Sequence, residues 1–228
     1  MYSDTAKNYD KIFKFNPAVI DLIQSQLNAQ PCKILDIGCG TGKYCSNLAK
    51  DHSVVGLDPD PQSISVAKSL FTGPSFYNHD LFSFEAEKDF DLIFCIGNVI
   101  SHIEQSRLPH FIDQVRSLLK NHGIWIFHTI NWDFILKQSE FTFPVLSNEG
   151  VTFKRYYKSI SEDSVAFETV LIDESGTETK NSITLYPHTD NSLQACHNLF
   201  SQVAHFADYR QTAFQPESIS SVYVFKAC

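Results

Sequence analysis

The feature that most constrains the fold of this chain is a glycine-rich turn that joins a short apolar run to a helical pattern. The run Lys33–Ile37 (Lys-Ile-Leu-Asp-Ile) is typical of a buried strand, and glycines follow at alternate positions, Gly38, Gly40 and Gly42. A helical pattern begins at Lys43. Glycine permits positive φ angles and close approach of a ligand to the backbone, and a helix start offers unpaired N–H groups. The sequence therefore predicts a site for a nucleotide-type cofactor.

Two classes of cofactor are bound at turns of this kind. The dinucleotide fingerprint G-x-G-x-x-G needs a third glycine at the position where this chain has Lys43. The observed spacing, with Asp36 two positions before Gly38 and glycines on alternate positions, resembles motif I of the class I methyltransferases that use S-adenosylmethionine (SAM). The resemblance implies SAM as cofactor and S-adenosylhomocysteine as product. The alternative without a cofactor is an ordinary strand–helix turn in a flavodoxin-like domain.

Composition narrows the class of protein and its partners. The 228 residues favour one domain, 1–228, and 43% hydrophobic with 19% charged residues is typical of a globular protein. A net charge of −8 argues against a nucleic-acid partner or an anionic membrane surface, both of which need a basic face. The chain contains no run of roughly 18 apolar residues, so we expect no membrane span.

Cysteine and histidine usage indicates the compartment and bears on metal binding. The six cysteines form no C-x-x-C pair, and the first residues carry no basic-then-apolar signal, so we expect reduced thiols in the cytoplasm. The nine histidines form no H-x-x-x-H pair and no cluster with cysteine. We therefore expect no metal site.

Strand and helix patterns alternate along most of the chain. The predicted strands are 33–37, 53–57, 75–78, 89–96, 124–130, 205–209 and 221–225. Predicted helices include 61–71, with Ile64, Ala67, Leu70 and Phe71 inward, as well as 105–121 and 192–204. The fold class expected from these patterns and from the resemblance is α/β. It is a Rossmann-like, seven-stranded, mainly parallel sheet with helices on both faces and an antiparallel β insertion covering the active site.

Residues 1–30 are predicted to form an N-terminal helical lid, in which Asn16 and Pro17 provide a cap and a first helical residue. Residues 6–10 (Ala-Lys-Asn-Tyr-Asp) resemble the segment that closes over cofactor and substrate in small-molecule methyltransferases. The resemblance places Tyr9 at the cofactor. Packing of Tyr9 on an amphipathic helix is the alternative.

The resemblance also assigns the remaining cofactor contacts. The methionine part lies on the glycine turn, the ribose at the end of the second strand, the adenine after the third strand, and the methyl group beside the loop after the fourth. The residues at these places are Asp36, Gly38, Cys39 and Gly40; Asp58 and Pro59; Asp80 and Leu81; Gly97 and Asn98. Asp58 follows Gly38 by 20 residues, and its carboxylate offers two acceptor oxygens to a ribose, of SAM or NAD alike. For Asp58 the alternative is a place beside the cap of the next helix, and for Asp80 that of a loop acid.

The loop after the fourth strand is the second specific motif. Residues 97–103 (Gly-Asn-Val-Ile-Ser-His-Ile) resemble the Gly-Asn-Ser-x-x-His-Leu segment of the glycine and sarcosine N-methyltransferases and related small-molecule enzymes. The resemblance implies that Asn98 and His102 flank the reacting methyl group. His102 is a candidate for substrate orientation or for a base, or it caps the loop. If the acceptor is a hydroxyl, His128 and His188 are further acid–base candidates.

The chain departs from the glycine-type enzymes at residues 131–133 (Asn-Trp-Asp), which resemble their Asn-Tyr-Asp motif. The arginine that precedes this motif in those enzymes and holds the substrate carboxylate is replaced by Ile130. Glycine is therefore a poor candidate substrate, unless Arg155 or Lys154 supplies the cation from elsewhere.

Residues 140–188 are predicted to form the antiparallel insertion, with strands at 151–160, 164–172 and 180–187. In the family this insertion covers the active site. The side chains we consider candidates for the acceptor pocket are Arg155, Tyr156, Tyr157, Tyr186 and His188; for each of them the alternative is cross-strand pairing on the surface.

The function expected from the resemblance is methyl transfer from SAM to a nitrogen or oxygen nucleophile of a small molecule by in-line displacement. Three alternatives remain: a dinucleotide-dependent oxidoreductase, a non-catalytic SAM-binding protein, and a methyltransferase acting on protein or nucleic acid. Lys43 and the lack of a Tyr-x-x-x-Lys pair argue against the first. The acidic charge and the lack of an Asn/Asp-Pro-Pro-Tyr motif at position 97 argue against the third. The sequence defines neither the acceptor nor the oligomeric state.

Overall fold

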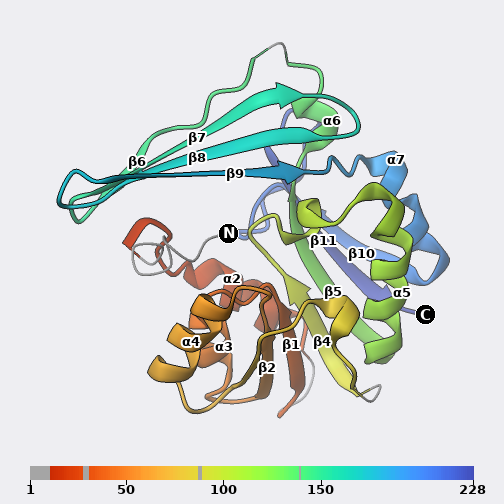
Figure 1. Cartoon of the computed structure of the whole chain (residues 1–228). Helices are drawn as coiled ribbons and strands as arrows, with labels where there is room; N and C mark the ends of the chain where they lie inside the picture. The colour runs from red at the N-terminus through yellow and green to blue at the C-terminus, as the bar shows by residue number, and fades with distance from the viewer. Residues whose placement is uncertain (1–10, 28–30, 87–88, 139) are drawn as a thin grey trace.

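The structure is a computed structural model that describes residues 11–27, 31–86, 89–138 and 140–228 (Figure 1). Its larger sheet, called the main sheet below, has seven strands in the order β10-β11-β5-β4-β1-β2-β3. Their bounds are β1 Lys33–Ile37, β2 Ser53–Leu57, β3 Ser75–Tyr77, β4 Phe90–Cys95, β5 Leu119–Ile130, β10 Phe200–Phe206 and β11 Ser220–Ala227.

Strands β1 to β5 of the main sheet run parallel, and β11 and β10 are added antiparallel at one edge. The chain order reverses beside β1, whose neighbours are β2 and β4. In open α/β sheets the ligand crevice lies outside the carboxyl ends of the strands at such a reversal. The topology therefore places a candidate site at the carboxyl ends of β1, β2 and β4.

Helices cover both faces of the main sheet. One face packs against α5 (Leu108–Leu118), which follows η3 (Gln105–Arg107), and against α7 (Asp190–Leu193) and η4 (Gln194–Asn198). The other packs against α2 (Pro17–Ser25), α3 (Lys43–Leu48) and α4 (Pro61–Leu70). Asn16 caps α2 and Asp60 caps α4, each before a proline that suits the first helical position. None of the described helices is long and apolar enough to cross a membrane.

A second, antiparallel sheet, called the cover sheet below, lies across one end of the main sheet (Figure 1). Its strands are β6 Leu146–Asn148, β7 Val151–Ile160, β8 Val165–Ile172 and β9 Glu178–Leu185. One part packs Val165 and Leu185 against Trp132 and Ile135 of α6 (Trp132–Ile135), directly after β5. At its other end a second apolar cluster includes Val151, Phe153, Leu171, Ile12 and Phe13.

The predicted fold class is confirmed: a seven-stranded, mainly parallel sheet with helices on both faces and an antiparallel insertion. The predicted insertion boundaries, 140–188, enclose the cover sheet, which has four strands rather than three. The additional strand is β6, whose three residues are too few to show an alternating pattern. Within the predicted N-terminal lid, α2 covers residues 17–25 and Lys11 and Ile12 are also helical, while residues 1–10 and 28–30 lie outside the described residues.

Two elements of the prediction are wrong in detail. The helix predicted at 105–121 ends at Leu118, because residues 119–123 already belong to β5. Leu70, predicted to face inward, is 58% exposed at the end of α4.

The helix predicted at 192–204 is wrong. Residues 190–198 form only short helical turns, and β10 takes the place of the rest of that helix. The strand predicted at 205–209 is confirmed only at residues 205 and 206, the last two of β10. The last predicted strand, 221–225, lies within β11. Pairing of β10 with β11 provides the backbone N–H and C=O groups of this segment with hydrogen bonds that a helix would otherwise supply. It also buries Phe200, whose ring centroid lies 5.3 Å from that of Trp125.

Candidate functional site

The glycine turn after β1 is held against β2 and opens toward one side. The backbone N–H groups of Gly38 and Cys39 both donate to the carbonyl of Leu57, at 2.8 and 2.9 Å. Gly38 (φ 79°) is closely packed, since a Cβ there would lie 2.5 Å from Val99 Cγ2. At Gly40 (φ 52°) no heavy atom of the described chain lies within 4 Å of a Cβ position. The turn therefore presents open backbone at Gly40 to a ligand.

Asp36 lies beneath this turn and is 1% exposed. Its Oδ2 accepts a hydrogen bond from the Cys45 thiol at 3.3 Å, whereas its Oδ1 is buried and has no partner among the described residues. Burial raises the pKa of the Asp36 carboxyl to about 8. The turn thus has an unpaired acceptor beneath it, which a ligand that donates hydrogen bonds would satisfy.

Asp58 follows β2 and faces the glycine turn. Its Oδ2 accepts from the N–H of Gly40 and its Oδ1 from that of Asp60, both at 2.8 Å. Burial raises the pKa of the Asp58 carboxyl, and these two hydrogen bonds lower it. Each carboxylate oxygen keeps a second lone pair. The predicted ribose contact and the place beside the helix cap are therefore compatible, because Asp60 itself caps α4 by accepting from Ser63.

Asp80 is exposed and serves as the N-cap of η1 (Leu81–Ser83). Its Oδ1 accepts from the N–H and the hydroxyl of Ser83, at 2.8 and 2.7 Å. Leu81 is 2% exposed and packs in the core, whereas Pro59 is exposed beside Asp58. The adenine contact of Asp80 and Leu81 stays a prediction.

The loop after β4 is bound to the end of β5 through Asn98, which adopts a positive φ of 70°. Its Oδ1 accepts three hydrogen bonds: from Ile130 N at 3.0 Å, Thr129 Oγ1 at 3.2 Å and Ser101 Oγ at 2.7 Å. Gly97 donates its N–H to the hydroxyl of Tyr209 at 3.3 Å. Asn98 thus braces the carboxyl ends of β4 and β5, and its contact with a reacting group stays a prediction.

The three candidate histidines lie in different surroundings. His102, at the end of η2 (Val99–His102), is partly buried, which lowers the pKa of its imidazole. His188 is 2% exposed, and its Nε2 lies 2.9 Å from the carbonyl of Ile103, a contact that links the cover sheet to the η2 loop. Burial lowers the pKa of His188 as well. Through this contact His188 helps to hold the η2 loop in position. Its acid–base role stays a prediction.

His128 lies in β5, with its ring 5.1 Å from that of Tyr209, whose hydroxyl contacts Gly97. Burial lowers the pKa of His128 to about 4, and its Nδ1 is buried without a hydrogen-bond partner in the described structure. With this pKa the imidazole is neutral near pH 7. It can therefore accept a proton, but it is not present as the imidazolium that would donate one.

Ser101 is a site residue that the sequence did not reveal. It is completely buried, and its hydroxyl accepts from Trp132 Nε1 at 2.9 Å while its carbonyl accepts from Tyr186 N at 2.7 Å. Ser101 therefore joins the η2 loop both to α6 and to the end of β9. These two partners lie 31 and 85 residues away in the chain, so no local pattern could have indicated them.

The pocket candidates of the insertion divide between the two faces of the cover sheet. Tyr157 packs in an aromatic cluster with Phe141, Phe143 and Phe167, at centroid distances of 5.8, 4.8 and 5.7 Å. Tyr156, by contrast, is 38% exposed and contacts Lys158 on the outer face. Tyr9 lies outside the described residues.

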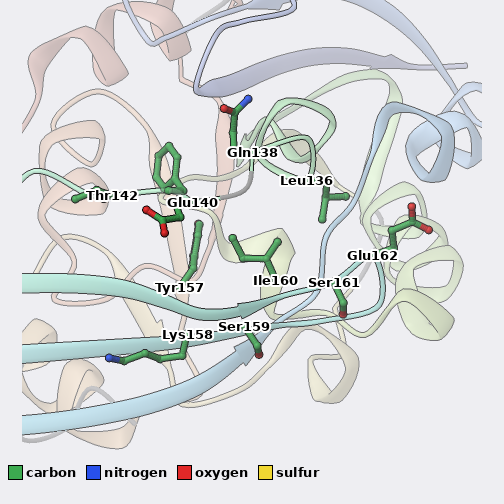
Figure 2. Close-up of a pocket in the computed structure, with 11 residues that line it drawn as sticks. Leu136, Gln138, Glu140, Thr142, Tyr157, Lys158, Ser159, Ile160, Ser161 and Glu162 are labelled. Atoms are coloured by element: carbon green, nitrogen blue, oxygen red, sulfur yellow. The ribbon is translucent and has the colours of Figure 1, made fainter.

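A cavity of about 650 Å³ opens between residues 136–142 and the end of β7 (Figure 2). Its lining residues are Leu136, Gln138, Glu140, Phe141, Thr142, Tyr157, Lys158, Ser159, Ile160, Ser161 and Glu162. They come from the α6 end and from β7, not from the glycine turn. This cavity therefore lies apart from the candidate cofactor site, and it shares Phe141 and Tyr157 with the aromatic cluster.

Comparison with known proteins agrees with this topology. Residues 34–123 match a family described as a methyltransferase domain. A SAM-dependent methyltransferase from Clostridium acetobutylicum superposes with a TM-score of 0.83 at 16% identity, covering 99% of this chain and 98% of that one. CalS10, a SAM-bound amino pentose methyltransferase from Micromonospora echinaspora, gives 0.72 at 17% identity, covering 100% and 92%.

The matches to curated relatives cover a smaller share of each chain than the matches to solved structures do. A ubiquinone biosynthesis O-methyltransferase from Histophilus somni is 26% identical over 68% of this chain and 71% of its own length. Two proteins at 30% identity, from Invertebrate iridescent virus 6 and Methanocaldococcus jannaschii, are covered over 43% and 50% of their length. The chain thus spans about half the length of these two relatives. The family match is confined to residues 34–123, and the solved structures show that the chain shares the fold of SAM-dependent methyltransferases.

The residues present fit this cofactor. Open backbone at Gly40 and the unpaired Oδ1 of Asp36 suit the methionine part, whose ammonium group donates hydrogen bonds. The remaining lone pairs of Asp58 suit the ribose hydroxyls. The resemblance assigned the same residues to the cofactor, and each of these contacts stays a prediction.

Proposed function

We propose that the protein transfers the methyl group of SAM to a nitrogen or oxygen nucleophile of a small molecule. The observation that carries the proposal is that the glycine turn, Asp58 and the Asn98 loop lie together at one edge of the main sheet. The end of the cover sheet is attached to this edge through Ser101. A site roofed in this way suits an acceptor small enough to lie beneath the cover sheet.

In the proposed reaction the bound sulfonium supplies an electrophilic methyl carbon. The chain's own residues bind and align: the glycine turn and Asp36 hold the amino-acid part, Asp58 the ribose, and Asp80 with Leu81 the adenine. Asn98 fixes the loop that faces the methyl group by binding the end of β5. The cover sheet excludes water, which would otherwise compete with the acceptor.

The need for a base depends on the acceptor. A neutral amine needs none before methyl transfer, whereas a hydroxyl must lose its proton. His102, His128 and His188 stay the base candidates; burial lowers the pKa of all three, and the value of about 4 for His128 makes its neutral imidazole a weak base. Among the similar proteins, the amino pentose methyltransferase and the ubiquinone biosynthesis O-methyltransferase support a small-molecule acceptor, and the second supports an oxygen nucleophile.

The proposal includes a cytoplasmic location and no nucleic-acid partner. All six cysteines are free thiols, and the net charge of −8 disfavours binding to phosphate backbones. Labelled SAM incubated with separate metabolite, protein and nucleic-acid fractions tests the acceptor class. We expect label only in the metabolite fraction, and none with Asp58→Ala.

Label in the protein or nucleic-acid fraction alone would refute a small-molecule acceptor. Binding of SAM without transfer to any fraction would instead support the non-catalytic alternative.

A further inference from the structure

The inner face of the cover sheet, meaning the face toward the main sheet, is apolar at both ends and polar in the middle. Val165 and Leu185 bury one end against α6, and Val151 and Leu171 bury the other beside Phe13. The two ends also connect to the cofactor edge. Tyr186 N donates to Ser101 O at 2.7 Å at one end, and Lys43 Nζ contacts Phe13 O at 3.5 Å at the other. The middle of the face therefore spans the edge that carries the glycine turn.

Three polar residues occupy that middle as direct cross-strand neighbours. Arg155 of β7 pairs with Thr169 of β8, which pairs in turn with Asn181 of β9. We call this set the polar row. Thr169 is 3% exposed, and the other two are partly buried. Polar groups in such a place cost free energy unless they find hydrogen-bond partners.

Two donors of the polar row lack partners within the described chain. Arg155 Nε and Asn181 Nδ2 are both buried and make no hydrogen bond. The guanidinium of Arg155 contacts the Phe143 ring at 4.7 Å and, through Nη2, the carbonyl of Pro144 at 3.4 Å. The ion pairs seen among the described residues use other side chains. A partly buried guanidinium without a carboxylate is costly for stability alone and is typical of a site that awaits an anion.

The rings beside Arg155 define the rest of such a ligand. Phe143 lies 4.8 Å from Tyr157 and 6.0 Å from Phe167, so aromatic surface begins directly next to the guanidinium. An apolar body packed on these rings would place an attached anionic group at Arg155. One guanidinium with two neutral neighbours suits a single negative charge better than a phosphate dianion, and its planar fork matches a carboxylate.

We propose that the polar row is the anchor for the methyl acceptor, and that the acceptor is a small carboxylate with an apolar or aromatic body. The inference rests on the proposed function, since it names the substrate class of that same site. It also accounts for Ile130 at the position where glycine-type enzymes carry their carboxylate-binding arginine, because here the cation comes from the cover sheet. Arg155 and Asn181 are then residues that touch substrate, and Thr169 lies between them.

Matched pairs of small probes test the anchor. The probes are benzoate, phenylacetate and 3-aminobenzoate, each compared with its primary amide, titrated by calorimetry into protein saturated with S-adenosylhomocysteine. We expect at least one carboxylate to bind at least about ten-fold more tightly than its amide, a preference worth about 1.4 kcal/mol. Arg155→Gln should abolish the preference and Asn181→Ala should reduce it. Lys180→Gln, on the exposed outer face one residue from Asn181, should leave it unchanged.

The outcomes separate the anchor from the proposed function. Equal binding of acid and amide, or no binding of any carboxylate, while S-adenosylhomocysteine still binds, overturns the anchor alone. Failure of the wild type to bind S-adenosylhomocysteine overturns the proposed function. A large loss of thermal stability in Arg155→Gln also counts against the anchor, because it would show that the fold itself satisfies the guanidinium. Asn181→Ala then provides the second, independent reading of the carboxylate preference.

Discussion

Replacing Gly40 by alanine separates backbone strain from ligand contact. Gly40 has a φ of 52° and open space at its Cβ position, so an added methyl group meets nothing within the described protein. Its effect on stability should come from the left-handed backbone alone, roughly 1–2 kcal/mol, partly offset by the lower entropy of the unfolded chain. For a domain of this size about 1 kcal/mol corresponds to a decrease in Tm of about 2–4 °C.

The chain offers a matched control in Gly176, in the turn between β8 and β9. Gly176 has a φ of 84° and likewise no described heavy atom within 4 Å of its Cβ position, but it belongs to a turn of the cover sheet and not to the glycine turn. Gly176→Ala should therefore show a similar decrease in Tm. Because the methyl group of Gly40→Ala would occupy the space assigned to the cofactor, only that variant should lose affinity for S-adenosylhomocysteine, by at least about ten-fold or 1.4 kcal/mol.

Thermal unfolding and calorimetric titration of both variants provide the two readouts. Equal affinity of Gly40→Ala and Gly176→Ala for S-adenosylhomocysteine, together with similar Tm values, would refute the assignment of Gly40 to the cofactor surface. Loss of affinity in both would show that the effect is one of stability rather than contact.

Three further variants test the electrostatics and bracing of the site. The buried Asp36 carboxyl, with its pKa raised to about 8, binds a proton more strongly in the folded than in the unfolded chain, so ligand-free stability should fall by up to about 1.4 kcal/mol per pH unit as pH rises from about 4 to about 8. Urea unfolding at several pH values should show this decline weakened in Asp36→Asn, and an unchanged pH profile would contradict it. The pKa of His128 is lowered to about 4, so its contribution to stability is lost as pH falls from about 6.5 through about 4. His128→Phe should be less sensitive to acid than the wild type, and equal sensitivity would show that His128 is not buried and neutral. Asn98→Ala removes the acceptor of Ile130 N and two hydroxyls and should cost about 1–3 kcal/mol in denaturant unfolding, whereas Asn98→Asp keeps the acceptor and should cost less. Identical stabilities for the two Asn98 variants would argue against the brace.

The parallel half of the fold could be predicted from the sequence because its signals are local. Strands β1, β2 and β4 are short apolar runs, and Asp60 with Pro61 marks the start of α4 by cap chemistry within three residues. Such patterns need no knowledge of the partner strand. The region 192–204 failed for the opposite reason: its spacing of Leu193, Cys196 and Phe200 suits a helix, but pairing with β11 determines its structure.

The candidate site was predictable where short local motifs supply it. The glycine turn and Asp58 were found in sequence, and the structure brings them together at 2.8 Å between Gly40 N and Asp58 Oδ2. The contacts that hold the reacting edge were not predictable. Asn98 binds Ile130 across 32 residues, and no spacing rule indicates that its carbonyl oxygen serves three donors. The polar row likewise became visible only once the register of β7, β8 and β9 was known.

Calorimetric titration of SAM, S-adenosylhomocysteine and NAD into the wild type and Asp58→Ala tests the central claim most directly. Asp58 is chosen because it is the acid that both cofactor classes would use, so the choice of ligand decides between them. We expect that SAM and S-adenosylhomocysteine bind the wild type, that Asp58→Ala weakens the binding of both, and that NAD gives no heat of binding. Binding of NAD together with silence for SAM would contradict the methyltransferase account and leave only the fold.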